Sequence, residues 1–142
     1  MVLEFMRGHR LAVQASTAPN GAPQAAVVGV AVSERGELVF DTLRSSRKCL
    51  NLRRDPRIAL VLGWDLADGR TLQLEGLADE PGGGDRVRLQ AVYLATFADG
   101  VERAEDPDIT YFRVRASWLR LSDFRTSPPT ITELELTWPP TG

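Results

Sequence analysis

One short stretch, residues 41–48, gathers the side chains best suited to bind an anion. It reads Asp-Thr-Leu-Arg-Ser-Ser-Arg-Lys and follows an apolar run, residues 38–40, that is typical of a strand. A short helical pattern comes next and must end near Asp55, because Pro56 disfavours helical geometry at the residue before it. The stretch is therefore predicted to be a strand-to-helix turn.

The predicted turn places positive charge at a helix N-terminus. Arg47 and Lys48 fall in the first helical turn, where backbone N–H groups are unpaired and the helix dipole is positive. The acid of a capping box is absent, since the residues three positions after Ser45 and Ser46 are not acidic. Ser46 and Thr42 could simply cap the helix or the turn. A bound anion, most simply a phosphate, would complement all of these groups.

Charge is distributed unevenly along the chain, which carries a net charge of −2. The segment 44–57 has a local charge of +5, which leaves −7 on the remainder. An acidic chain with one basic segment is not typical of a nucleic-acid-binding protein, which spreads positive charge over a whole face. The segment is either a site for one small anionic ligand or a solvated helix face. Its basic residues are Arg44, Arg47, Lys48, Arg53, Arg54 and Arg57.

Composition narrows the class of protein. The 142 residues, 43% apolar and 25% charged, predict one domain over 1–142 with a hydrophobic core. No apolar run approaches the roughly 18 residues of a membrane span, and the first residues do not resemble a secretory signal, so we expect a cytoplasmic protein without membrane contact. The single Cys49 and single His9 argue against a protein-only metal site, and no nucleophile or paired-carboxylate motif identifies catalytic residues.

The remaining elements must position this turn. Alternating patterns predict a mainly β chain with short helices, and tight connections make its sheet mostly antiparallel and prone to close into a small barrel. An acidic loop is expected over 98–108, and Asp85 is expected to cap the helix that runs to Phe97. Strands are predicted at 11–15, 25–32, 37–42, 57–64, 71–77, 109–124 and 130–136, and the other helices at 2–8 and 46–54.

The order of several short motifs resembles one known family. The motifs are Asn20-Gly21-x-Pro23, the strand 38–42, Ser46-Arg47-Lys48-x-x-Asn51-Leu52-x-x-Asp55-Pro56 and Leu74-Glu75-Gly76-x-Ala78. Together they resemble the pyridoxamine-5′-phosphate-oxidase-like family of flavin-binding split barrels. The resemblance implies a six-stranded, mostly antiparallel split β-barrel. It also implies a homodimer with flavin mononucleotide (FMN) sites at the subunit interface.

The resemblance assigns roles to particular residues. It implies that the turn holds the FMN phosphate, and that one strand near residue 28 and another near residue 72 reach the isoalloxazine ring. The phosphate-binding positions are Thr42, Ser46, Arg47 and Lys48, and the ring-contacting positions are Val27, Val28, Gly29, Thr71 and Gln73.

Departures from the family pattern place the chain outside the vitamin-B6 oxidase itself. Two basic phosphate ligands of that enzyme correspond to Ala25 and Val30, and no Arg-x-His pair stands near the C-terminus. The resemblance is therefore to the broader branch, which includes FMN binders, deazaflavin-dependent reductases and haem-handling proteins. Three hypotheses follow: a flavin-dependent oxidoreductase of an unknown small-molecule substrate, a deazaflavin-dependent reductase, or a flavin- or haem-binding protein without turnover.

Overall fold

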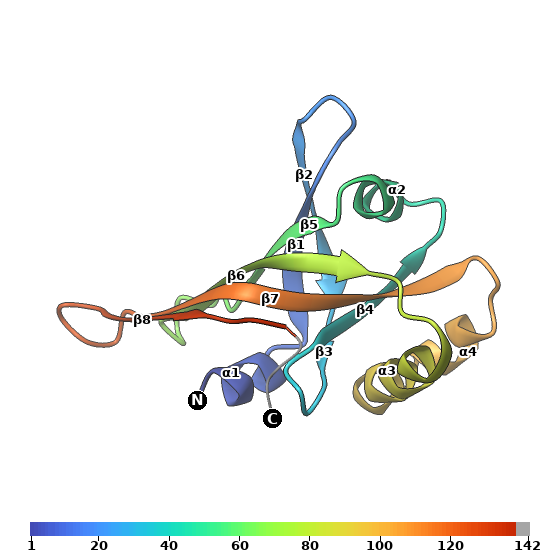
Figure 1. Cartoon of the computed structure of the whole chain (residues 1–142). Coiled ribbons are helices and arrows are strands. Elements are labelled where there is room, and N and C mark those ends of the chain that lie inside the picture. The colour runs from blue at the N-terminus through green and yellow to red at the C-terminus, as the bar shows by residue number, and fades with distance from the viewer. Residues whose placement is uncertain (139–142) are drawn as a thin grey trace.

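Within residues 1–138, a strongly curled antiparallel sheet forms the body of the protein, with four helices around it (Figure 1). The structure is a computed structural model that describes residues 1–138. The strands are β1 (Leu11–Thr17), β2 (Pro23–Gly29), β3 (Ala31–Val32), β4 (Leu38–Leu43), β5 (Arg57–Leu62), β6 (Arg70–Asp79), β7 (Ile109–Asp123) and β8 (Thr130–Glu135). The helices are α1 (Val2–Gly8), α2 (Arg47–Arg54), α3 (Gly83–Thr96) and α4 (Gly100–Ala104).

The strand order makes the sheet a split barrel. Its path is β2-β1-β5-β6-β7-β4-β3, every pairing is antiparallel, and β8 pairs with β7 beside this path. The strands at the two ends of the path, β2 and β3, are consecutive in the chain and are separated only by Val30. The chain therefore passes directly from one end of the strand path to the other at Val30. The fold is mainly β with short helices, as the sequence predicted.

One predicted strand is divided in two. The sequence predicted a single strand over 25–32, but β2 pairs with β1 whereas β3 pairs with β4. The backbone N–H of Val30 donates to the carbonyl oxygen of Arg10 at 2.8 Å, where the segment leaves one partner for the next. Hydrophobicity is continuous across this point, so the pattern carries no sign of the change of partner.

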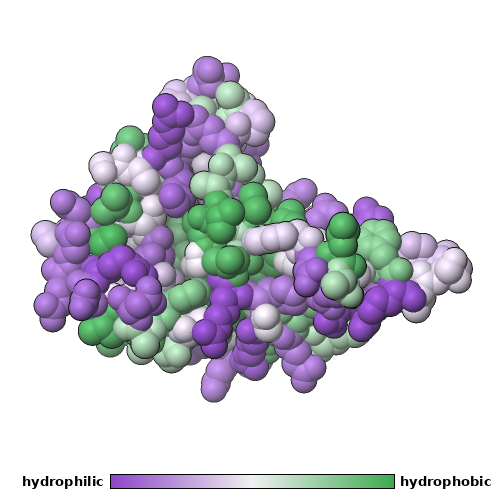
Figure 2. All heavy atoms as spheres, turned by 180° about the vertical axis from the view of Figure 1, so that it is seen from behind, coloured by the Kyte–Doolittle hydropathy of each residue, from purple (hydrophilic) through white to green (hydrophobic). Residues whose placement is uncertain are grey.

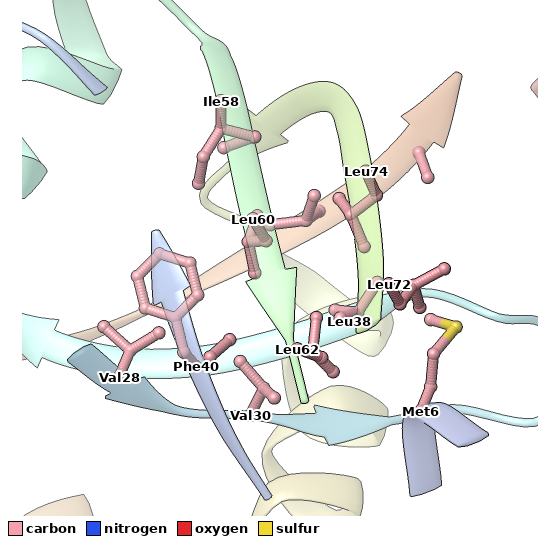
Figure 3. Close-up of a cluster of buried hydrophobic side chains, with 14 of the residues drawn as sticks. Met6, Val28, Val30, Leu38, Phe40, Ile58, Leu60, Leu62, Leu72 and Leu74 are labelled. Carbon is pink, nitrogen blue, oxygen red and sulfur yellow. The ribbon is translucent and has the colours of Figure 1, made fainter. Parts of the chain in front are cut away.

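Apolar side chains on the inner face of the strands form the core (Figure 3). Leu60 and Leu62 of β5 are no more than 2% exposed, and the rings of Phe40 and Phe112 stack with centroids 5.7 Å apart. Each such buried side chain stabilises the fold by roughly 2 kcal/mol. Within the predicted strand 71–77, Leu72 and Leu74 lie on this face, whereas Leu77 is 55% exposed.

The α3–α4 region covers the β3–β4 part of the sheet. The rings of Tyr93 and Phe97 lie 4.9 Å apart, and a Cβ added at Gly29 would come within 2.9 Å of the Phe97 ring. Two predictions here were wrong. The expected loop 98–108 contains α4, and α3 begins at Gly83, so Asp85 lies in its first turn and is not its cap.

No helix in residues 1–138 combines the length and the apolarity needed to cross a lipid bilayer.

Candidate anion-binding site

The predicted strand-to-helix turn connects β4 to α2, and two hydroxyl groups hold it. The hydroxyl oxygens of Thr42 and Ser46 are 2.9 Å apart and share a hydrogen bond. Ser46 is the N-cap of α2, and its Oγ accepts the backbone N–H of Cys49 at 3.2 Å. Thr42 is 6% exposed. Both hydroxyls therefore fix the turn. Ser46 occupies the N–H of Cys49, and the N–H groups of the first two α2 residues, Arg47 and Lys48, stay available to a ligand.

Two basic residues of the segment are neutralised by carboxylates. The guanidinium of Arg53 donates twice to Glu80, with an Nε–Oε1 distance of 2.6 Å, and hydrogen bonding to Arg53 lowers the pKa of the Glu80 carboxyl. Arg57 likewise donates to Asp55, with an Nη2–Oδ2 distance of 2.6 Å. These hydrogen bonds lower the pKa of Asp55 to about 2. Neither arginine contributes free positive charge.

Two further arginines are engaged with backbone carbonyl groups. Arg44 donates from Nε to the carbonyl oxygen of Pro107 at 2.9 Å and lies 3.8 Å from a Glu80 oxygen. Arg54 donates to the carbonyl oxygen of Thr17 at the end of β1. These contacts hold α2 and the preceding turn against the barrel.

Arg47 and Lys48 remain, and they stand together in the first turn of α2. Within residues 1–138, neither has an ion pair with a carboxylate. Both line a pocket of about 290 Å³ between α2 and the β1–β2 hairpin. The other residues that line this pocket, which we call the anion pocket, are Gln14, Ser16, Gln24, Ala25 and Ala26.

A buried amide attaches the anion pocket to α2. The side-chain nitrogen of Asn51, which is 3% exposed, donates to Ser16 Oγ at 3.2 Å and to Gln24 Oε1 at 2.8 Å. One α2 residue thereby fixes β1 and β2 beside the helix N-terminus. A second hollow of about 560 Å³ lies alongside and shares Gln24 and Arg47 with the pocket.

The anion pocket suits a phosphate group. It offers two cations without acidic partners, the positive end of a helix dipole and neutral amides. Ala25, one of the two positions that depart from the family pattern, lies in the pocket wall, whereas Val30 is buried in the core at 2% exposure. A phosphate here would thus be held by α2 residues without a charged side chain from Ala25.

The residues predicted to contact the flavin ring do not line the anion pocket. Val27 is 59% exposed on the outer face of β2, Val28 is buried in the core, and Gly29 packs against α3. Thr71 and Gln73 lie on β6, on the side opposite the buried leucines. Two strands, β1 and β5, separate β6 from β2 in the sheet, and neither Thr71 nor Gln73 lines the anion pocket.

Sequence reasoning missed the neutral part of the pocket. Gln14, Ser16 and the adjoining Asn51 are all buried, and none was predicted to be a site residue, although Asn51 belongs to one of the motifs that carry the resemblance. A signal was present: Ala12, Gln14 and Ser16 alternate on β1, so the inner face of an otherwise apolar strand carries two polar residues. Polar residues at core-facing positions indicate a polar partner or a ligand.

The fold and this pocket define a split-barrel protein with an anion pocket at the N-terminus of α2. A family model described as Pyridoxamine 5'-phosphate oxidase matches residues 2–123. The chain belongs to that family.

Solved structures share the fold. A haem binding protein from Mycobacterium smegmatis superposes with a TM-score of 0.82 at 18% identity; the match covers 92% of this chain, which spans only 55% of that protein. The haem storage protein HutZ from Vibrio cholerae gives 0.70 at 14% identity, with 81% and 87% covered. A pyridoxamine 5'-phosphate oxidase-related, FMN binding protein from Nostoc punctiforme gives 0.68 at 12% identity, with 90% and 88% covered. At these identities the likeness concerns the fold alone. A comparison with curated proteins gave no match.

Proposed function

We propose that this protein binds FMN, with the phosphate of the cofactor in the anion pocket, and serves as a flavin-dependent oxidoreductase. The observation that carries the proposal is the pairing of charges along residues 44–57. Acids or backbone carbonyls engage four of the six cations there, and Arg47 and Lys48 alone face a pocket at a helix N-terminus. Membership of the family supports the choice of a flavin phosphate over other phosphate esters.

The ring of the cofactor needs surface outside the anion pocket, and we propose that a second copy of the chain helps to form it. Apolar side chains gather in the middle of the face seen from behind in Figure 2, below the β1–β2 tip. Exposed apolar residues on the outer side of the sheet include Leu11, Val27 and Leu77, each more than half exposed. A homodimer that covers this face would bury them and bring the outer residues Thr71 and Gln73 of one copy near a cofactor held by the other.

Different residues would bind the phosphate and the ring of the cofactor in such a site. Arg47 and Lys48 would anchor the phosphate, and Ser46 and Thr42 hold the turn that presents them. The outward side chain of Val27 would shield the ring from water. When bound, a flavin would supply hydride or electron-pair transfer. The substrate class is a small molecule that accepts or donates two electrons.

Haem binding is the second candidate, because two proteins of the same fold bind or store haem by name. The single histidine of the chain favours the flavin. His9 stacks on Phe5 with centroids 4.0 Å apart, its Nδ1 lies 2.7 Å from the Phe5 carbonyl oxygen, and its Nε2 lies 3.5 Å from Asp68. Ligation of iron by His9 would require the loss of one of these contacts. A deazaflavin remains the third candidate, since the same pocket would hold its phosphate.

Titration of the purified protein with FMN, a deazaflavin and haem tests the assignment. We expect FMN to bind most tightly, with quenching of its fluorescence. The double variant Arg47→Ala/Lys48→Ala should weaken FMN binding by about a hundredfold, as expected for two charge-assisted contacts. The matched control is Arg57→Ala, which removes a cation already paired with Asp55 and should leave FMN affinity within twofold. Equal losses in both variants, or no loss in either, would refute the phosphate assignment.

Sedimentation tests the dimer. We expect the protein to sediment as a dimer at micromolar concentration, and the variant Val27→Glu to shift it toward the monomer by placing a charge on the apolar face. A wild-type protein that sediments strictly as a monomer would remove the interface site, although the anion pocket of one chain would stand.

A further inference from the structure

One buried polar side chain of the anion pocket, Gln14, has an oxygen that makes no hydrogen bond within residues 1–138. Gln14 points inward from β1, where it pairs with Ala26 of β2 and Leu60 of β5, and its side chain is 1% exposed. Its Oε1 has no hydrogen-bond partner among the described residues. Because a buried polar atom without a partner destabilises a fold, an apolar residue would serve better here on stability grounds alone.

The other neutral polar residues of the pocket, in contrast to Gln14, have hydrogen-bond partners. Ser16 and Gln24, the two other polar neutral residues of the pocket, both accept hydrogen bonds from Asn51. Gln14 shares the pocket with Arg47 and Lys48, and neither of these side chains hydrogen-bonds to its amide. The amide thus lines the same pocket as these two cations, and its oxygen is left without a partner among the described residues.

We propose that Gln14 is a ligand-binding residue, which hydrogen-bonds the phosphorylated end of the cofactor. The proposal rests on the proposed function and extends it to a residue that the sequence did not indicate. A carboxamide both donates and accepts, so Nε2 can donate to a phosphate oxygen and Oε1 can accept from the adjacent hydroxyl of the cofactor side chain. A neutral amide can also distinguish ligands by the position of their oxygen atoms, because its hydrogen bond is directional and adds no charge. Gln14 would then add to the preference for a phosphorylated flavin that Arg47 and Lys48 provide.

The proposal predicts opposite effects on stability and on binding. Methionine has nearly the shape of glutamine and no polar group to satisfy, so Gln14→Met should leave the ligand-free protein as stable as wild type, or raise its Tm by about 3 °C. The same substitution should weaken FMN binding by about tenfold or more. Riboflavin, which lacks the phosphate, should bind wild type and variant more nearly alike. A residue with only a structural role would lose stability on the same substitution.

The experiment measures the dissociation constants of FMN and riboflavin by fluorescence, and Tm without ligand, for wild type, Gln14→Met and Gln14→Leu. The matched control is Gln90→Met on α3, away from the pocket, which should keep FMN affinity within twofold. Unchanged FMN affinity in both Gln14 variants, with the Arg47→Ala/Lys48→Ala loss intact, would overturn the role of Gln14 and leave the proposed function standing. A large fall of Tm in both Gln14 variants would also overturn it, because the amide would then be satisfied within the fold. A wild-type protein that binds no FMN would refute both proposals.

Discussion

Replacement of Asn51 by leucine tests how the fold maintains the anion pocket. The amide nitrogen donates two hydrogen bonds, one to Ser16 and one to Gln24, at 3.2 and 2.8 Å. Ser16 is 4% exposed, so water does not readily replace the lost donor, whereas the half-buried Gln24 can turn toward solvent. At about 1 kcal/mol for each bond, plus the cost of leaving one buried acceptor unpaired, Asn51→Leu should destabilise the protein by about 2–3 kcal/mol.

Urea unfolding measures this loss. The midpoint should fall with no change in the slope m, and Tm should drop by about 6–9 °C. The control is Asn20→Ala, since Asn20 accepts one backbone N–H in the exposed β1–β2 turn and its replacement should cost about 0.5 kcal/mol or less. FMN affinity should also fall in Asn51→Leu, because β1 and β2 would no longer be fixed beside α2.

A double-mutant cycle isolates the contact between β1 and α2. If the hydrogen bond to Ser16 contributes, Ser16→Ala combined with Asn51→Leu should cost less than the two single losses added together. A loss below about 0.5 kcal/mol for Asn51→Leu, or strictly additive losses in the cycle, would refute the reasoning that this amide holds the pocket together.

Two further predictions concern the charges of the protein. Burial raises the pKa of the Glu37 carboxyl, but hydrogen bonds from Arg88 and Ser33 and the nearby guanidinium charges outweigh it and lower the pKa below 4.5. Stability from this group is therefore present above pH 4.5 and lost as the pH falls through the lowered pKa, so Glu37→Gln should flatten the acid limb of stability measured by urea unfolding from pH 7 to pH 3; an unchanged limb would contradict this. Ala25→Arg adds a cation to the wall of the anion pocket and should tighten inorganic phosphate binding by about fivefold at low salt, less at high salt, measured by competition with FMN; no gain at low salt would mean that position 25 does not face the anion.

The sequence located the turn but did not reveal which of its charges are free. The carboxylate that neutralises Arg53 is Glu80, which is 27 residues away, and the carbonyl that engages Arg44 lies 63 residues away. Such partners are set by the closure of the barrel and leave no trace in a local pattern. The sequence also did not decide whether Ser46 caps α2. That role depends on the backbone geometry at the start of the helix, which only the structure shows.

The sequence pattern of β2 likewise did not reveal which of its two faces is buried. The run of small apolar residues around Val27 and Val28 indicated a buried strand, yet alternate side chains face solvent and core at 59% and 6% exposure. A uniformly apolar pattern does not say whether the second face meets the same chain or another one. Within residues 1–138 the side chain of Val27 is exposed, and the homodimer proposed above would cover it.

The two ends of a flavin would thus depend on different parts of the assembly. The anion pocket is complete within one chain, since α2, β1 and β2 supply all of its walls. The residues proposed to contact the ring, in contrast, lie on β2 and on the distant outer face of β6. A dissociated protomer should therefore retain affinity for inorganic phosphate while it loses affinity for FMN, because only the phosphate end finds all of its contacts in a single chain. The variant Leu77→Glu places a charge on the same apolar face and leaves Val27 intact. Once sedimentation shows it to be a monomer, assays with both ligands separate these two contributions: parallel losses of phosphate and FMN affinity would show that the pocket itself depends on the second copy.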